Sequence, residues 1–346
     1  MKRIRNIFDI AISYESLWAA FDAIRRDNNK KHRKRIKAFS KHLYENLMAL
    51  HNALKNGTWH MHEYRHITRL EGRKLREIWY SHDFGDMIVQ RALCMTIGVL
   101  LNKSLIKDTY AGIPGKSMHK AVRKLWRRIK SLPKDSRVWC YKCDIKQFYM
   151  SIDHDVLKQA LIDKIKDKRM LKLLFGIIDS SPFPVGLPIG NMMSTVFANY
   201  YLNAIDRMAQ SMDIVYFRYN DDIVVISTDK DKVRDFRTAI HSAVKPLLLT
   251  IKPNDRLFPL DNFGLDYVGY IIQTNRILIR RCTERKLRRR YSRFYDNPSM
   301  HVACGVVAYW GWCKRSKSGH VLWYVVTGVC IDHFNAKAIR LCVCKK

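Results

Sequence analysis

Two adjacent aspartates, Asp221 and Asp222, are the residues whose type and placement point most directly to chemistry. They follow Tyr219 and Asn220 between two apolar runs, which is the pattern of a β-hairpin with carboxylates at its tip. Neighbouring carboxylates suit a hard divalent cation, because such ions prefer oxygen ligands. Asn-Asp is also common in tight turns, so the dipeptide alone leaves a plain hairpin turn open.

A third carboxylate, Asp144, ends an apolar run that starts near residue 138 and predicts a buried strand. An unpaired charge there would be costly, which weakens the plain-turn interpretation. If an antiparallel sheet gathers Asp144 with Asp221 and Asp222, the three can hold two divalent ions for an in-line displacement at phosphorus. The chain suits a polyanionic substrate, since its formal net charge is +32. An anionic membrane or unspecific binding is the alternative.

The composition narrows the class of protein. The chain has 346 residues, of which 47% are hydrophobic, and this is enough for two or three subdomains. Nine cysteines without regular spacing indicate a reducing compartment instead of a disulfide scaffold. The N-terminus lacks the apolar core of a signal peptide, and prolines and glycines interrupt the uncharged stretch 180–205. We therefore expect a cytoplasmic protein without a membrane partner.

The elements that must position these carboxylates form a mixed α+β pattern. Apolar residues recur with helical spacing over 7–55, and 64–70 with 75–80 predicts a basic hairpin. Further predicted helices cover 87–101, 118–130, 155–178, 194–208 and 232–249, with strands near 265–272 and 276–280. The remainder, from residue 283, is predicted to be helical and basic.

The order of motifs resembles reverse transcriptases of the bacterial and phage group. The segment from Asp144 to Tyr149 resembles the first palm motif of that family, and Tyr219-Asn220-Asp221-Asp222 resembles its YxDD box. The resemblance implies a right-hand polymerase. N-terminal helices and fingers would occupy 1–135, the palm 136–275 with interleaved fingers helices at about 155–185, and the thumb 276–346.

The same resemblance implies RNA-dependent DNA polymerase activity with two Mg²⁺ ions, for which Mn²⁺ can substitute. The catalytic residues would be Asp144, Asp221 and Asp222, and the metal site would also include Ile145. The template RNA, the cDNA or primer and deoxynucleoside triphosphates (dNTPs) would be the partners.

The resemblance also assigns residues to the substrates. The dNTP would contact Arg73, Lys74, Arg76, Tyr149 and Lys252, with Tyr149 as the steric gate against a 2′-hydroxyl. The template and fidelity residues would be Ile189, Gly190, Ser194 and Thr195. A primer grip would consist of Tyr267, Gly269 and Tyr270, and nucleic acid would bind to Arg285, Lys286, Arg288, Arg289 and Arg290.

Within the group, the chain looks most like the enzymes of diversity-generating retroelements, which copy a template-repeat RNA with errors directed to adenine. Their partner is an oligomer of a basic helical accessory protein. The fidelity segment of that subgroup ends in Ser-Gln, whereas here Thr195 follows Ser194 and has no amide group. A defence-associated enzyme, a group II intron-like enzyme and a non-catalytic RNA-binding scaffold are the alternatives.

Overall fold

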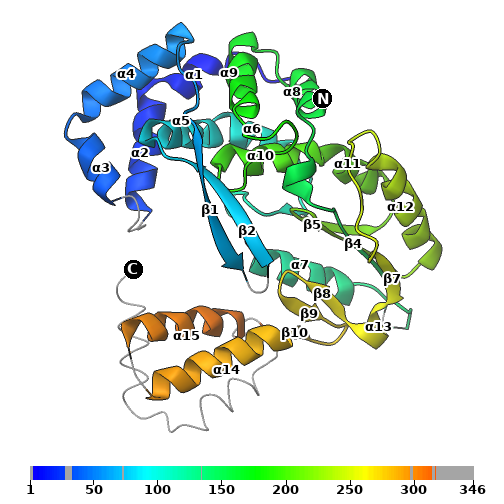
Figure 1. Ribbon diagram of the computed structural model, residues 1–346. Coiled ribbons are helices and arrows are strands. Elements are labelled where there is room, and N and C mark those ends of the chain that lie inside the picture. Colours follow the sequence, from blue (N-terminus) through cyan, green and yellow to red (C-terminus); the bar gives the residue numbers. More distant parts are fainter. Residues whose placement is uncertain are drawn as a thin grey trace. The chain divides into compact units, whose positions relative to one another are not determined.

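The computed structural model describes residues 3–27, 33–71, 74–133, 135–296, 299–313 and 316. The chain divides into two compact units. Figure 1 labels their helices and strands. The first comprises Met1–Ile113, Asp144–Met212 and Thr238–Pro253, and the second Pro114–Cys143, Asp213–Arg237 and Asn254–Lys346. Both contain helices and strands, and successive strands pair antiparallel in the hairpins, which fits the predicted α+β class.

The first unit is mainly helical and also carries one long hairpin. Strands β1 (Tyr64–Glu71) and β2 (Lys74–Ser81) pair along their full length, and β3 (Thr109–Tyr110) is short. The helices are α1 (Phe8–Ile12), α2 (Tyr14–Arg26), α3 (Arg33–Ser40), α4 (Leu43–Asn56), α5 (Phe84–Met95), α6 (Ile97–Lys103), α8 (His154–Lys164), α9 (Lys168–Asp179), α10 (Met192–Tyr201) and α11 (Asn203–Ser211), with the 3₁₀ helix η2 (Phe148–Ser151).

Helix α5 is the centre of the first unit, and both α2 and α10 pack against it. It begins after Asp83, whose side chain accepts a hydrogen bond from the Asp86 backbone N–H, so the helix has a capped N-terminus. The predicted helix over 87–101 is instead two helices, because α5 ends at Thr96. There the Thr96 backbone leaves the helical region, with φ −107° and ψ −89°, and Thr96 Oγ1 donates to the Ala92 carbonyl oxygen at 2.8 Å.

By length and composition alone, the stretch Phe84–Lys103 could cross a membrane. However, 61% of its apolar window is buried inside the described protein, as in the core helix of a globular domain.

The second unit is built on a sheet in which the strands run in the order β5-β6-β4-β7. These are β4 (Trp139–Asp144), β5 (Val215–Tyr219), β6 (Asp222–Ser227) and β7 (Arg256–Pro259). Helix α7 (Met118–Lys130) has the predicted bounds and contacts β5 with its apolar face. A smaller sheet contains β8 (Leu265–Tyr267), β9 (Tyr270–Ile272) and β10 (Ile277–Ile279).

The remaining helices are α12 (Lys230–Ala243), α13 (Leu260–Phe263), α14 (Arg281–Asp296) and α15 (Met300–Cys313). Helix α12 is shorter than the predicted 232–249 at its C-terminal end. Helices α14 and α15 pack against each other and form the part of the expected thumb that the structure describes.

Candidate active site

Strands β5 and β6 present Asp221 and Asp222 at a two-residue turn. Tyr219 pairs with Asp222, which leaves Asn220 and Asp221 as the turn. Asn220 has a φ of 58°, in the left-handed region that asparagine tolerates. Its Nδ2 donates to Asp221 Oδ1 at 3.2 Å. Residues 223–226 are fully buried, so the core of the sheet anchors the turn, and the predicted hairpin is confirmed.

Two cations that the sequence did not single out serve this turn. Lys142 Nζ, from β4, lies 3.3 Å from Asp222 Oδ1. Arg218 in β5 is fully buried, and its guanidinium donates to the Asn220 carbonyl oxygen at 3.1 Å. Lys142 reaches Asp222 because β4 is the neighbour of β6 in the sheet. No local pattern in the sequence signals that order.

Asp144 ends β4 and has a lysine partner of its own. Lys252 Nζ donates to Asp144 Oδ2 at 2.6 Å, and the Lys252 backbone N–H donates to the Asp144 carbonyl oxygen at 2.9 Å. Ile145 forms an antiparallel bridge with Ile251 beside them. Asp144 Oδ1 is buried without a hydrogen-bond partner in the described part of the chain. A buried carboxylate oxygen without a donor fits a hard cation, which would satisfy it.

The expected steric gate and the expected fidelity segment meet in the first unit. Tyr149, on η2, donates from its hydroxyl to Thr195 Oγ1 on α10 at 3.5 Å. The loop containing Gly112 lies against the same threonine, since a Cβ at residue 112 would lie 2.1 Å from Thr195 Cγ2. Ser194 is buried beside it. Thr195 is therefore fixed by a hydrogen bond on one side and by close packing on the other.

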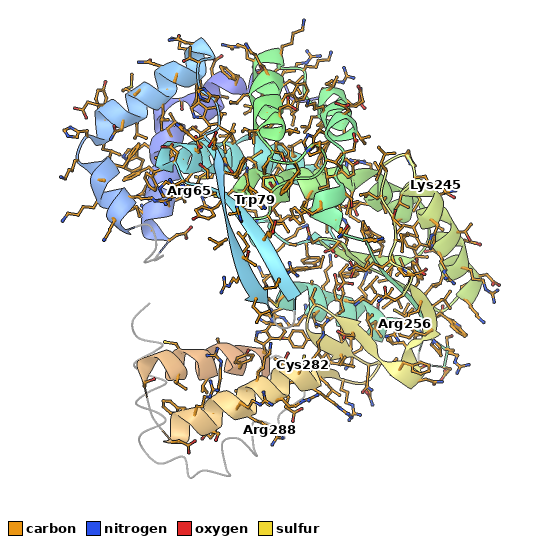
Figure 2. All side chains as sticks on the ribbon, in the orientation of Figure 1. Arg65, Trp79, Lys245, Arg256, Cys282 and Arg288 are labelled. Atoms are coloured by element: carbon orange, nitrogen blue, oxygen red, sulfur yellow. The ribbon has the colours of Figure 1, made fainter. Side chains whose placement is uncertain are left out.

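The start of the fidelity segment lies along the β1–β2 hairpin. The Trp79 backbone N–H donates to the Ile189 carbonyl oxygen at 2.9 Å, and a Cβ at Gly190 would lie 2.7 Å from the Trp79 carbonyl oxygen. Asn191 Nδ2 donates to the Tyr64 hydroxyl at 2.6 Å. Figure 2 shows Trp79 on this hairpin together with Arg65.

The expected dNTP-binding cations of the hairpin are described only in part. Arg76 is exposed on β2 and pairs across the strands with Arg69. Lys74 is the first residue of β2, and Arg73 lies outside the described residues. Lys252 is expected at the triphosphate, and in the structure its ammonium group forms an ion pair with Asp144.

The expected primer grip is the β8–β9 turn. Tyr267 and Tyr270 pair across it, and both rings are buried. The Tyr270 hydroxyl hydrogen bonds with His119 Nδ1 at 2.8 Å, and its ring stacks on Trp312 with centroids 5.1 Å apart. A Cβ at Gly269 would lie 2.2 Å from Trp312 Cζ3. The close approach that glycine permits here is therefore made by an indole of α15.

The expected nucleic-acid helix is α14. It exposes a basic surface while Leu287 is buried, and its residues Arg285, Lys286, Arg288 and Arg289 are exposed. Arg290 lies over the ring of Tyr309 on α15, 5.7 Å from its centroid. Figure 2 labels Arg288 and Cys282 on this helix. The arrangement gives α14 one basic surface and one face that packs.

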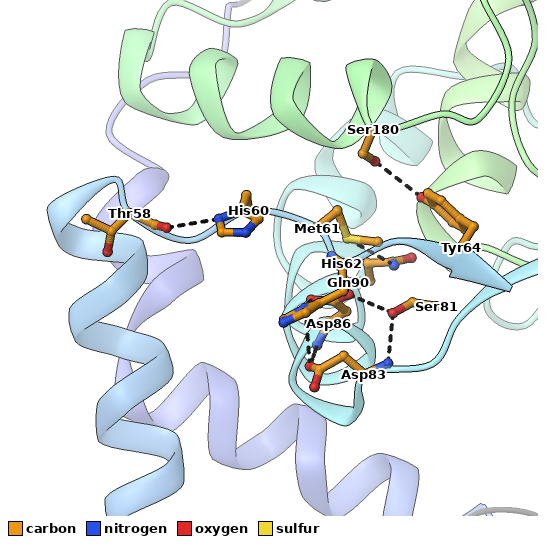
Figure 3. Close-up of polar contacts among 10 residues, drawn as sticks. All are labelled: Thr58, His60, Met61, His62, Tyr64, Ser81, Asp83, Asp86, Gln90 and Ser180. Carbon is orange, nitrogen blue, oxygen red and sulfur yellow. Dashed lines mark hydrogen bonds and ion pairs between the residues drawn. The ribbon is translucent and has the colours of Figure 1, made fainter.

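A second group of metal-capable side chains, His62, Asp83 and Asp86, lies at the base of the β1–β2 hairpin (Figure 3). Their candidate ligand atoms lie within 4.8 Å of one another, so these residues could hold a metal ion. His62 Nδ1 is 3.1 Å from Asp86 Oδ1 and 3.8 Å from Asp83 Oδ1. The hydrogen bond with Asp86 raises the pKa of His62 above its ordinary value, whereas burial lowers it by less. The sequence did not predict this group.

The predicted site residues thus fall into local sets: Asp221 with Asp222, Asp144 with Lys252, and Tyr149 with Thr195. The first set belongs to the second unit, and the other two belong to the first unit.

Comparison with known proteins decides the family. The sequence profile described as reverse transcriptase (RNA-dependent DNA polymerase) matches residues 56–272, more than half of the chain. The chain belongs to the reverse transcriptase family. The palm-motif resemblance is confirmed at this level.

Two curated relatives match part of this reverse transcriptase. The group II intron-encoded protein LtrA of Lactococcus lactis subsp. cremoris is 23% identical over 184 residues, which cover 50% of this chain and 30% of LtrA. Protein YkfC of Escherichia coli (strain K12) is 26% identical over 130 residues, which cover 35% of this chain and 34% of YkfC. The matches therefore span about a third of each relative's length.

A solved structure supports the fold. The apo telomerase from Candida tropicalis matches with a TM-score of 0.50 at 11% identity, covering 64% of this chain and 49% of that chain. At this identity the likeness concerns the fold alone. With the family match, it confirms the predicted right-hand polymerase fold.

The packing of Gly112 against Thr195 predicts a graded loss of stability. Gly115→Ala is the matched control, because Gly115 also has a positive φ of 76° but has no atom within 4 Å of its Cβ position. We expect the control to cost about 1–2 kcal/mol for the left-handed backbone. Gly112→Ala should cost about 2–4 kcal/mol, because overpacking is added. Urea denaturation measures both.

Adding Thr195→Ser to Gly112→Ala removes the clashing methyl group and should recover the excess over the control. Equal costs for the two alanine variants would contradict this packing.

Proposed function

We propose that this reverse transcriptase is an active RNA-dependent DNA polymerase that copies an RNA template into cDNA. The observation that supports this most is which side chains share one face of strand β4. Side chains alternate along a strand, so Lys142 and Asp144 project from the same face of β4. Lys142 contacts Asp222 from that face. We infer that Asp144, Asp221 and Asp222 form one centre for nucleotidyl transfer.

The donor set fits divalent metal ions. Asp144, Asp221 and Asp222, with Ile145, would hold two Mg²⁺ ions, for which Mn²⁺ is a substitute because it takes the same oxygen ligands. Bound there, the ions supply Lewis-acid stabilisation of the attacking 3′-hydroxyl and the leaving pyrophosphate. Lys142 and Lys252 offset the repulsion among the carboxylates, since each lies within ion-pair distance of one of them.

We also propose the substrate contacts that the motif resemblance implies. Arg73, Lys74 and Arg76 on the hairpin bind the triphosphate, because arginine and lysine pair with phosphate oxygens. Tyr149 stands under the sugar and disfavours a 2′-hydroxyl. Residues 189–195 contact the templating base. The tip of β8–β9 supports the primer end, and the basic surface of α14 follows the phosphates of the duplex.

For the biological role, we propose a retroelement enzyme that copies a template RNA together with a basic helical accessory protein oligomer. The motif resemblance supports this role. Because Thr195 stands where the subgroup has glutamine, the pattern of copying errors is the property that tests the assignment best. The likeness of part of the chain to an intron-encoded protein supports a group II intron-type role as the second candidate.

Removing one carboxylate should abolish polymerisation without unfolding the protein. We expect Asp222→Asn and Asp144→Asn each to slow nucleotide incorporation on a primed RNA by about 10³-fold, the equivalent of several kcal/mol of lost charge stabilisation. Single-turnover primer extension in Mg²⁺ measures this. Asp213→Asn is the control, since Asp213 is an exposed residue paired with Lys232. Full activity in both variants would show that these carboxylates are not the catalytic ones, whereas no incorporation by the wild type in Mg²⁺ would support the non-catalytic scaffold.

The residue at position 195 should alter which template bases are copied with errors. Glutamine adds an amide group that both donates and accepts, next to the Tyr149 hydroxyl that Thr195 contacts. We expect Thr195→Gln to raise the ratio of errors at template adenines to errors at other bases. Thr195→Val, of similar shape, is the control. Sequencing cDNA made from a defined RNA measures the ratio, and the same ratio in all three proteins would contradict the retroelement assignment.

A further inference from the structure

One buried carboxylate, Asp86, joins the two ends of the β1–β2 hairpin to helix α5. The side chain of Asp86 is fully buried. Its Oδ2 accepts from the His62 backbone N–H at 3.0 Å and from Ser81 Oγ at 2.6 Å. Its Oδ1 contacts His62 Nδ1 at 3.1 Å. His62 precedes β1 and Ser81 ends β2, so a single side chain fixes both strands where they leave the core (Figure 3).

The same helix also fixes the beginning of α10. Gln90, one turn beyond Asp86, accepts a hydrogen bond at Oε1 from the Met192 backbone N–H at 3.1 Å. Asn191 caps α10 by accepting from the Met193 N–H at 3.0 Å, and its amide group donates to the Tyr64 hydroxyl. Helix α5 therefore holds the hairpin through Asp86 and the template segment through Gln90.

A contact between hairpin and segment completes the connection. The Trp79 N–H donates to the Ile189 carbonyl oxygen at 2.9 Å, close to Gly190. The hairpin cannot shift at its base without straining this bond or the bond from Asn191 to Tyr64. The position of the hairpin and the position of the segment are thus set together.

We propose that Asp86 is a positioning residue that sets the dNTP-binding hairpin against the template segment. This inference rests on the proposed polymerase function. A change at Asp86 should weaken dNTP binding and alter base selection. It should do so although the Asp86 side chain is buried at the base of the hairpin, away from the exposed cations of the hairpin.

A metal ion at His62, Asp83 and Asp86 is the competing explanation. The hydrogen bonds favour the positioning role, because both oxygens of Asp86 already interact with N–H or O–H groups. Asp83 Oδ1 in turn accepts from the Asp86 N–H at 2.9 Å as the helix cap. A charged group that is buried with such a set of donors needs no metal ion to be stable.

The positioning role also carries a pH dependence through His62. Asp86 and Asp83 face its imidazole, and the ring of His60 lies 6.0 Å away. The hydrogen bond with Asp86 is the main cause of the raised pKa of His62. Its stabilising effect is therefore complete below about pH 6.5, the ordinary histidine value, and is lost as the pH rises through the folded-state pKa. The Tm difference between wild type and His62→Gln should therefore become smaller as the pH rises through the folded-state pKa of His62.

Steady-state kinetics of wild type, Asp86→Asn and Asp206→Asn test the proposal. Asp206 is a matched control, because it is also fully buried and accepts from the Thr109 hydroxyl at 2.8 Å, away from the hairpin. We expect Asp86→Asn to raise the KM for dNTP about tenfold with a smaller change in kcat, the pattern of lost substrate binding. Asp206→Asn should leave KM unchanged. Equal KM values in both variants would overturn the proposal.

Hydrogen exchange of the same proteins keeps the proposal testable if the wild type fails to polymerise, an outcome that would refute the proposed function itself. Asp86→Asn should speed exchange of the hairpin amides, including Trp79, and of residues 189–193. Unchanged exchange would overturn the positioning role, as would one zinc ion retained per wild-type chain. Ser81→Ala, which removes one donor and keeps the carboxylate, should show the same effects more weakly if Asp86→Asn does not fold.

Discussion

Acidic side chains can be kept close together only where positive charge offsets their repulsion, and the proposed centre depends on this balance. Asp222 is 3.3 Å from Lys142, and Asp144 is 2.6 Å from Lys252. The buried Arg218 holds the carbonyl oxygen at the hairpin tip. In a chain of formal net charge +32, these three cations differ from the rest because they serve the acidic residues directly. Other basic side chains, such as Arg76 on β2 and Arg285 on α14, are exposed, which suits contact with a polyanion.

Two parts of the first unit, the residues around Thr195 and the β1–β2 hairpin, differ in how firmly they are held. Thr195 is packed against Gly112 and bonded to Tyr149, so the residue that we propose to lie at the templating base has little freedom. The hairpin that presents Arg76 is exposed over much of its length and is fixed at its base by Asp86. If these parts bind the template and the dNTP as proposed, a rigid template segment would keep the template in place. An exposed hairpin that is anchored at its base would meanwhile let the dNTP enter.

The sequence predicted those features that depend on short stretches of chain. The hairpin tip followed from two apolar runs around Asn220 and Asp221, and α7 was predicted as a basic helix with the bounds that the structure shows. The break between α5 and α6 was missed because the apolar pattern continues through Thr96, where the backbone leaves the helical region.

Interactions between distant residues could not be predicted from one sequence. Asp86 and His62 are 24 residues apart, and Asn191 and Tyr64 are 127 residues apart. Lys142 meets Asp222 only through the order of strands in the sheet. Trp312 approaches Gly269, and this contact was not predicted because the sequence placed the helix of Trp312 only within a general basic segment.

The most direct measurement of the central claim is iron-mediated cleavage of the polypeptide, with Fe²⁺ in place of Mg²⁺ in the presence of a primed RNA and a dNTP. Radicals formed at the bound ion cut the chain nearby. If Asp144, Asp221 and Asp222 form one metal centre, cleavage will occur around residue 144 and around residues 221–222 in the same sample, and Asp222→Asn will suppress both cuts. Cleavage confined to residues 62, 83 and 86 would contradict the account.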